Sequence, residues 1–199
     1  MHVSLRSTVW LASFLFGLAA CGGGGKPPAH AASGETPDTF YESAVTMAKT
    51  KTPTVEHSMS FALLMVNEKN GARFSRHYVG LAGPQRLENG KWILGGAAYH
   101  RSTGKIVSTL AIVLPSIAPD AYVSEGTGRD LDIGIALDTA DWVEDAPATL
   151  WSHNGASAHV TITAIAGTKH LEGTITGKAV ANEGAAAFRI EKGYFYVNP

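Results

Sequence analysis

Histidine is the residue type in this chain with the clearest potential for metal or proton-transfer chemistry. His153 and His159 lie six residues apart across Asn154-Gly155, so a hairpin there could bring the two imidazoles together. Zinc would need a third ligand, and His170 on the following strand is the candidate. No pair has the His-Glu-x-x-His spacing, so we expect exposed strand or loop histidines rather than a metal site. The histidines of the folded part are His57, His77, His100, His153, His159 and His170.

Carboxylates gather in one stretch, with four between Asp138 and Asp145. Their oxygens are the ligand type that calcium prefers. The stretch lacks the Asp-x-Asp-x-Asp-Gly signature of a calcium loop, so a solvated acidic loop after a strand is the favoured interpretation.

Nucleophilic catalysis has weak support in the sequence. Neither a Gly-x-Ser-x-Gly nor a Ser-x-x-Lys motif is present. Ser75 and Ser152 each have a histidine nearby, His77 and His153, but no third orienting group accompanies them. A triad assembled from distant residues remains an alternative, and the sequence predicts no catalytic residue and no cofactor.

Aromatic residues near the C-terminus could form a binding platform. On a strand, Tyr194 and Tyr196 would lie on one face, and Phe195 and Val197 on the other. We expect this segment, with Phe188 before it, to belong to the core and to a partly hydrated edge. Other candidates for a contact surface lie near predicted turns, namely Trp92, Trp142 and Trp151.

Cys21 is the single cysteine of the chain and ends the sequence Leu18-Ala19-Ala20-Cys21. It follows Arg6 and ten nearly all apolar residues, Val9 to Leu18, which are too few to span a hydrocarbon core of about 30 Å. This layout resembles the lipobox of bacterial lipoproteins processed by signal peptidase II. The resemblance implies that residues 1–20 are a signal peptide and that the Cys21 thiol is alkylated with diacylglycerol. An ordinary cleaved secretory signal is the alternative.

Residues 21–36 have the composition of a tether. Four glycines and two prolines follow Cys21, and such a segment cannot bury enough apolar surface to fold. Gly22, rather than aspartate, follows the cysteine, so the resemblance implies sorting to the outer membrane. We therefore expect a lipid-anchored protein of the cell envelope, on its periplasmic or surface face.

Composition argues against a nucleic-acid-binding protein and against a fold stabilised by disulfides. Without residues 1–20, which hold one arginine and no acid, the chain has 15 basic and 17 acidic side chains, with no basic block for nucleic acid. A lipidated Cys21 leaves no thiol for a disulfide. The remaining residues, 37–199, are enough for one domain stabilised by core burial.

One short helix is predicted at the start of this domain. Thr36 is a suitable N-cap, Pro37 suits the first helical position, and Asp38 lies in the first turn. Apolar residues then recur at helical spacing through Ala48, and we expect the helix to stop before Pro53.

Strand-like patterns begin at about Glu56. Apolar and polar residues alternate over 131–137, 160–164 and 171–179, which is typical of half-buried strands. The run Ile106–Leu114 is apolar except at Ser108 and Thr109, and predicts a central strand covered on both faces.

Turn residues predict hairpins between these strands. Asn70-Gly71, Asn89-Gly90 and Asn154-Gly155 favour type I′ turns, in which both residues have positive φ. Residues 102–105 and 167–168 predict further hairpin ends. We therefore expect an all-β fold of nine or ten antiparallel strands, either a β-sandwich or a small β-barrel, with one short N-terminal helix.

The C-terminal segment His170 to Val197, with Gly-Thr-Ile-Thr-Gly at 173–177 and Gly-Tyr-Phe at 193–195, resembles the closing meander of small β-rich bacterial lipoproteins. Together with the glycine tether, it is similar to surface lipoproteins that end in small barrels, such as the transferrin-binding and factor-H-binding types. No partner-binding residue can be transferred from them.

The expected function is a non-enzymatic one: binding of a ligand or protein partner in the cell envelope by a domain held at the membrane through its lipid. The alternative is a periplasmic hydrolase or metal-dependent enzyme whose site is built from distant histidine and aspartate residues. A structural role within an envelope assembly is a third interpretation.

Overall fold

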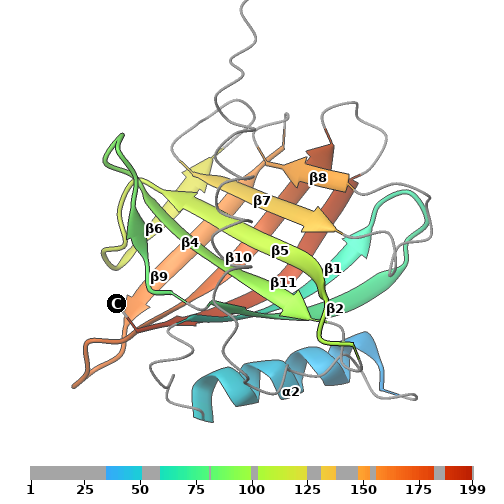
Figure 1. Ribbon diagram of the computed structural model, residues 1–199, viewed down its shortest axis with the longest axis horizontal. Coiled ribbons are helices and arrows are strands. Elements are labelled where there is room, and N and C mark those ends of the chain that lie inside the picture. The colour runs from blue at the N-terminus through green and yellow to red at the C-terminus, as the bar shows by residue number, and fades with distance from the viewer. Residues whose placement is uncertain are drawn as a thin grey trace, which may run out of the picture.

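The computed structural model describes residues 35–50, 59–80, 82–99, 103–124, 131–137, 148–152, 156–181 and 187–198. These residues form one helix and an antiparallel sheet (Figure 1). The elements are α2 (Pro37–Thr50), β1 (Met59–Asn67), β2 (Arg73–Gly80), β3 (Gln85–Arg86), β4 (Trp92–Tyr99), β5 (Ile106–Leu114), β6 (Asp120–Ser124), β7 (Asp132–Leu137), β8 (Ala148–Trp151), β9 (Ala158–Ala164), β10 (Leu171–Ala181) and β11 (Ala187–Val197).

The sheet curves into a nearly closed barrel, the second of the two predicted alternatives. Strands pair in the order β11-β1-β2-β4-β5-β7-β8-β10, and β10 also pairs with β11, which completes the ring. The β8–β10 seam is short, since it consists of the pairs Val180↔Trp151 and Ala181↔Leu150. Nearer its N-terminal end, over residues 171–177, β10 pairs instead with β9, and β9 pairs with β6. The sheet therefore branches at β10.

The inside of the barrel is filled by apolar side chains. Alternation sends Phe61 and Leu63 of β1 inward, and Phe195 of β11 meets Phe61 with ring centroids 6.0 Å apart. Side chains from β5, β7 and β9 join the same cluster, including Leu110, Ile133 and Val160, each at most 1% exposed. At about 25 cal/mol per Å² of apolar surface, this burial is the main stabilising term of the fold.

The prediction that Ile106–Leu114 forms a central strand covered on both faces is confirmed by β5. Seven of its nine residues are buried, and Ile106 and Val113 are half-buried. Its two polar residues lie within this buried environment, and Ser108 Oγ donates a hydrogen bond of 2.9 Å to the carbonyl oxygen of Ala136.

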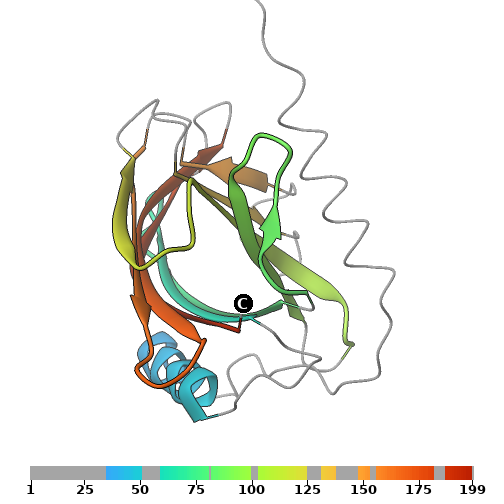
Figure 2. The ribbon, with the colours of Figure 1, turned by 90° about the vertical axis from the view of Figure 1, so that its left-hand side faces the viewer.

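The predicted helix is also confirmed, and it lies outside the barrel against β1, β2 and β11 (Figure 2). The Thr39 amide donates to Thr36 Oγ1 at 3.2 Å, which is the expected N-cap bond. Phe40, Tyr41 and Ala44 of the helix bury Ala62 and Leu64, the outward-facing side chains of β1.

The predicted type I′ turns are wrong for both Asn-Gly pairs that the structure describes. Gly71 and Gly90 have positive φ, 72° and 82°, but among the described residues every positive φ belongs to a glycine. Asn70 and Asn89 instead accept hydrogen bonds at Oδ1 from the amides two residues later, at 2.9 and 3.1 Å. Asparagine stabilises these turns through its side chain, so its backbone does not need the left-handed region. Asn154-Gly155 lies outside the described residues.

The predicted hairpin ends at residues 102–105, of which the structure describes 103–105, and at 167–168 agree with the connections β4–β5 and β9–β10. Gly104 and Gly167 have φ of 66° and 76°, which glycine adopts without steric cost. Among the described residues no helix is long and apolar enough to span a bilayer.

Candidate functional site

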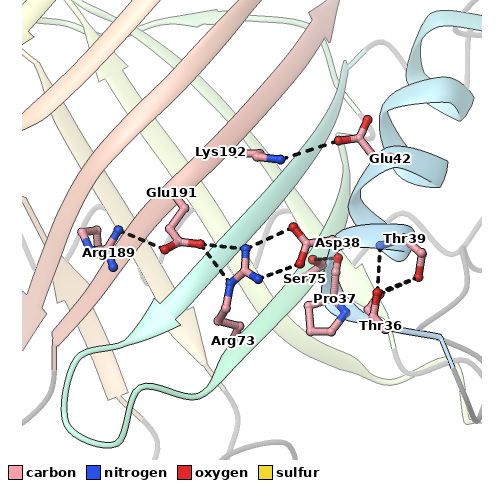
Figure 3. Close-up of polar contacts among 10 residues, drawn as sticks. All are labelled: Thr36, Pro37, Asp38, Thr39, Glu42, Arg73, Ser75, Arg189, Glu191 and Lys192. Carbon is pink, nitrogen blue, oxygen red and sulfur yellow. Dashed lines mark hydrogen bonds and ion pairs between the residues drawn. The ribbon is translucent and has the colours of Figure 1, made fainter.

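Polar contacts fix the first turn of α2 to the barrel (Figure 3). Arg73 of β2 donates two hydrogen bonds to the Asp38 carboxylate, at 2.7 and 3.1 Å, and a third to Glu191 Oε2 at 3.0 Å. The Ser75 hydroxyl donates to the carbonyl oxygen of Pro37. Both carboxylates raise the pKa of the Arg73 guanidinium, mainly through these hydrogen bonds.

The network continues away from the helix along β11 and β10. Arg189 bridges Glu191 at 3.1 Å and Glu68 at 3.3 Å, and Lys178 lies 2.6 Å from Glu68. These side chains are 25–48% exposed, so each pair contributes on the order of 0–1 kcal/mol. These pairs are therefore minor terms in the stability of the fold, and only the Arg73–Asp38 pair of this network reaches the helix.

Tyr194 and Tyr196 do not form an open binding platform. They are 8% and 6% exposed because Ala48 of α2 packs against them, while Phe195 and Val197 point into the barrel. The favoured interpretation of core plus a partly hydrated edge is therefore confirmed.

The hydroxyl groups at this edge reach polar partners on β10 and beside it. Tyr194 donates to Glu172 Oε2 at 2.7 Å, and the hydroxyl of Tyr196 is hydrogen-bonded to His170 Nδ1. The pKa of Tyr194 is raised, first by burial and then by the Glu172 carboxylate. Lys49 Nζ lies 5.0 Å from the centroid of the Tyr194 ring. This cluster joins the C-terminal end of the helix to the sheet.

The structure separates two of the three histidines considered for zinc. His159 pairs with Thr176 in the β9–β10 register, whereas His170 precedes β10. The two positions are six residues apart along the strands, about 20 Å, so His170 as a third ligand is wrong. His57, His100 and His153 lie outside the described residues, within which no three His, Cys, Asp or Glu side chains could hold a metal.

Neither serine singled out by its neighbouring histidine is arranged for catalysis. Ser75 bonds to the helix, as described above. Ser152 Oγ donates to Asp132 Oδ1 at 2.8 Å and accepts from the Ile133 amide at 3.0 Å, which links β7 to the end of β8.

A serine–histidine pair that the sequence analysis missed lies on β1 and β2. Ser60 Oγ is 2.7 Å from His77 Nε2. The two residues are 17 positions apart in the chain, and the hairpin register brings them together by pairing His77 with Ala62. Only the register of the β1–β2 hairpin could have revealed the pair, because it decides which residue of β1 stands opposite His77.

Several other candidates fall outside the part that the structure describes. These are Cys21, the acidic stretch Asp138–Asp145 and Trp142. The backbone of Trp151 belongs to β8, and Trp92 is half-buried at the start of β4.

An exposed patch without Asp, Glu, Lys or Arg lies on the outside of β6, β9 and β10, between Glu172 and Lys178 of β10. We call it the threonine face, and it comprises Ala121, Val123, His159, Thr161, Thr163, Thr174 and Thr176, all exposed. Thr161 stands opposite Thr174 and Ala121, and His159 stands opposite Thr176 and Val123, so the seven residues share one side of three strands. Val123 is 54% exposed.

The threonine face has the properties of a contact surface. It holds no Asp, Glu, Lys or Arg, so a partner would not have to remove a full charge from water. Its four threonines are β-branched and stiff at χ1, which reduces the entropy lost when the surface is immobilised.

Comparison with known proteins yields no relative: no protein-family model, curated protein or solved structure matches the chain.

Proposed function

We propose that the protein is a lipid-anchored binding protein of the cell envelope, held at Cys21 and contacting a protein partner through the threonine face. The anchor is supported by the lipobox-like sequence at residues 18–21 and by the glycine tether that follows it. Gly22 after the cysteine supports the outer membrane as its location.

The observation that carries the binding role is the exposed threonine face, a patch of seven residues without Asp, Glu, Lys or Arg, on a barrel whose interior is packed with apolar side chains. Because Phe61, Leu110, Ile133 and their neighbours fill the inside, a partner is bound on the outside. There α2 covers β1, β2 and β11, whereas β6, β9 and β10 present the threonine face.

The chemistry of this face favours a protein over other partners. Membranes and nucleic acids are attracted by clustered Lys and Arg, which this face lacks. Flat stacking of bases uses exposed aromatic rings, whereas Tyr194 and Tyr196 are covered. The centres of protein–protein interfaces are depleted in charged residues, as this face is.

Site-specific crosslinking in cells tests the proposal. A photoreactive amino acid at position 161 or 174 should give a covalent adduct of higher mass with one partner. The matched control is position 88, where the exposed Glu88 lies in the turn before β4. Equal adducts from position 88, or none from 161 and 174, would contradict the proposed surface.

A second pair of variants separates contact from folding. Thr161→Arg and Thr174→Arg place a charge on an exposed position, so the melting temperature should stay near that of the unmodified protein. In Thr161→Arg the adduct formed from position 174 should be lost, and in Thr174→Arg the adduct formed from position 161 should be lost. Retention of that adduct in both variants would show that the partner binds elsewhere.

A further inference from the structure

The Ser60–His77 pair is a nucleophile and a base held at hydrogen-bonding distance by two paired strands. Ser60 Oγ lies 2.7 Å from His77 Nε2, within the range expected for a serine and its general base. Both side chains are half-buried. Strands hold such a pair more rigidly than loops do.

The pair has a defined chemical requirement. Nε2 accepts the serine proton when it is unprotonated, so the ring hydrogen must then be on Nδ1, which is buried from solvent. A serine hydroxyl is weakly nucleophilic by itself, and an adjacent imidazole activates it by taking its proton.

A second hydroxyl–imidazole pair flanks the first. Tyr196 is the residue of β11 that stands opposite Ser60, and its hydroxyl group bonds to His170 Nδ1. Residues directly opposite in antiparallel strands have Cβ atoms about 4.5–5.5 Å apart. Two histidines and two hydroxyl groups thus lie on one outer face of the barrel, beside the C-terminal end of α2.

We propose that Ser60, activated by His77, is a nucleophile that accepts an acyl group from an ester. Ser60 Oγ bonds to the ester carbonyl carbon while its proton moves to His77 Nε2. The ester C–O bond then breaks, and the alcohol leaves with that proton. Water attacks the acyl-serine in the same way, releases the carboxylic acid and restores the hydroxyl. This activity is separate from binding at the threonine face.

A fluorophosphonate probe tests the nucleophile in the full mature protein held in detergent. The Ser60 oxygen should displace fluoride and become covalently labelled, and peptide mass spectrometry should place the label on Ser60. Ser60→Ala should remove the label. His77→Gln retains a hydrogen-bonding side chain but cannot take the proton, so labelling should slow by at least tenfold.

Ser157→Ala is the matched control, because Ser157 is a half-buried serine immediately before β9. It should label as fast as the unmodified protein. Thermal melting checks that each variant is folded, and His77→Gln answers the question if Ser60→Ala does not fold. Absence of label on Ser60, or equal labelling of His77→Gln, would show that the pair is a structural hydrogen bond only.

Discussion

Gly173 lies where β9, β10 and β11 meet, and its replacement by alanine should strongly destabilise the barrel. A Cβ atom at this position would lie 2.1 Å from the carbonyl oxygen of Thr161 and 2.3 Å from Cζ of Phe195. Ordinary carbon–carbon contacts are about 3.5–4.0 Å, so the Phe195 ring would have to move by more than about 1 Å. Phe195 is fully buried, which leaves it no room.

The cost follows from the same contacts. Overpacking a well-packed core typically costs about 1–3 kcal/mol, and here both a backbone oxygen and a buried ring obstruct the methyl group. We therefore expect Gly173→Ala to lower the free energy of unfolding by about 3 kcal/mol. The assay is urea unfolding of residues 36–199, followed by circular dichroism.

Gly167→Ala is the control for the loss of glycine itself. Gly167 has a φ of 76°, and a methyl group added there would meet no atom within 4 Å, so alanine introduces conformational strain but no clash. The left-handed region costs a residue with a side chain about 1–2 kcal/mol. If Gly173→Ala costs no more than Gly167→Ala, the close packing of Phe195 on Gly173 is refuted.

Three further predictions concern the helix, the ion network and the core. Phe40→Ala removes a side chain that is 4% exposed and should cost about 3–5 kcal/mol in urea unfolding, unless α2 detaches alone, which would appear as a separate early transition. Glu68 has a lowered pKa, chiefly because Lys178 donates a hydrogen bond to it. Its contribution to stability is therefore present above the pKa of the unfolded chain and is lost as the pH falls through the folded pKa. Glu68→Gln should accordingly reduce the stability difference between pH 7 and pH 3, and an unchanged difference would contradict this. Tyr78→Phe removes the buried hydrogen bond of 3.0 Å to Ser108 and should cost about 1 kcal/mol by chemical unfolding, whereas a gain in stability would contradict it.

Local elements were predictable because their signals are local. The helix begins where Thr36 and Pro37 predict it, since capping involves only the first turn. Alternation identified the inward residues of β10, such as Ile175 and Ala179, because successive side chains of a strand point to opposite faces.

The closure of the barrel could not be predicted in the same way. A sandwich and a barrel share the same hairpins, and they differ in which distant strands pair. Here β1 pairs with β11, bringing Met59 opposite Val197. No turn residue encodes a contact over that separation in the chain.

The Ser60–His77 pair depended on a detail of one turn. A two-residue type I′ turn at Asn70-Gly71 would place His77 opposite Leu64, too far from Ser60. The longer connection between Asn67 and Arg73 shifts the register by two residues and places His77 opposite Ala62. The error in turn type therefore concealed the pair.

Attachment of lipid to Cys21 is the central claim, because the proposed location and role of the barrel depend on it. Mass spectrometry of the N-terminal peptide of the mature protein tests this directly. The account predicts that the chain begins at Cys21 and carries a diacylglyceryl thioether on the sulfur. A mature N-terminus at another residue, or an unmodified Cys21, would contradict it.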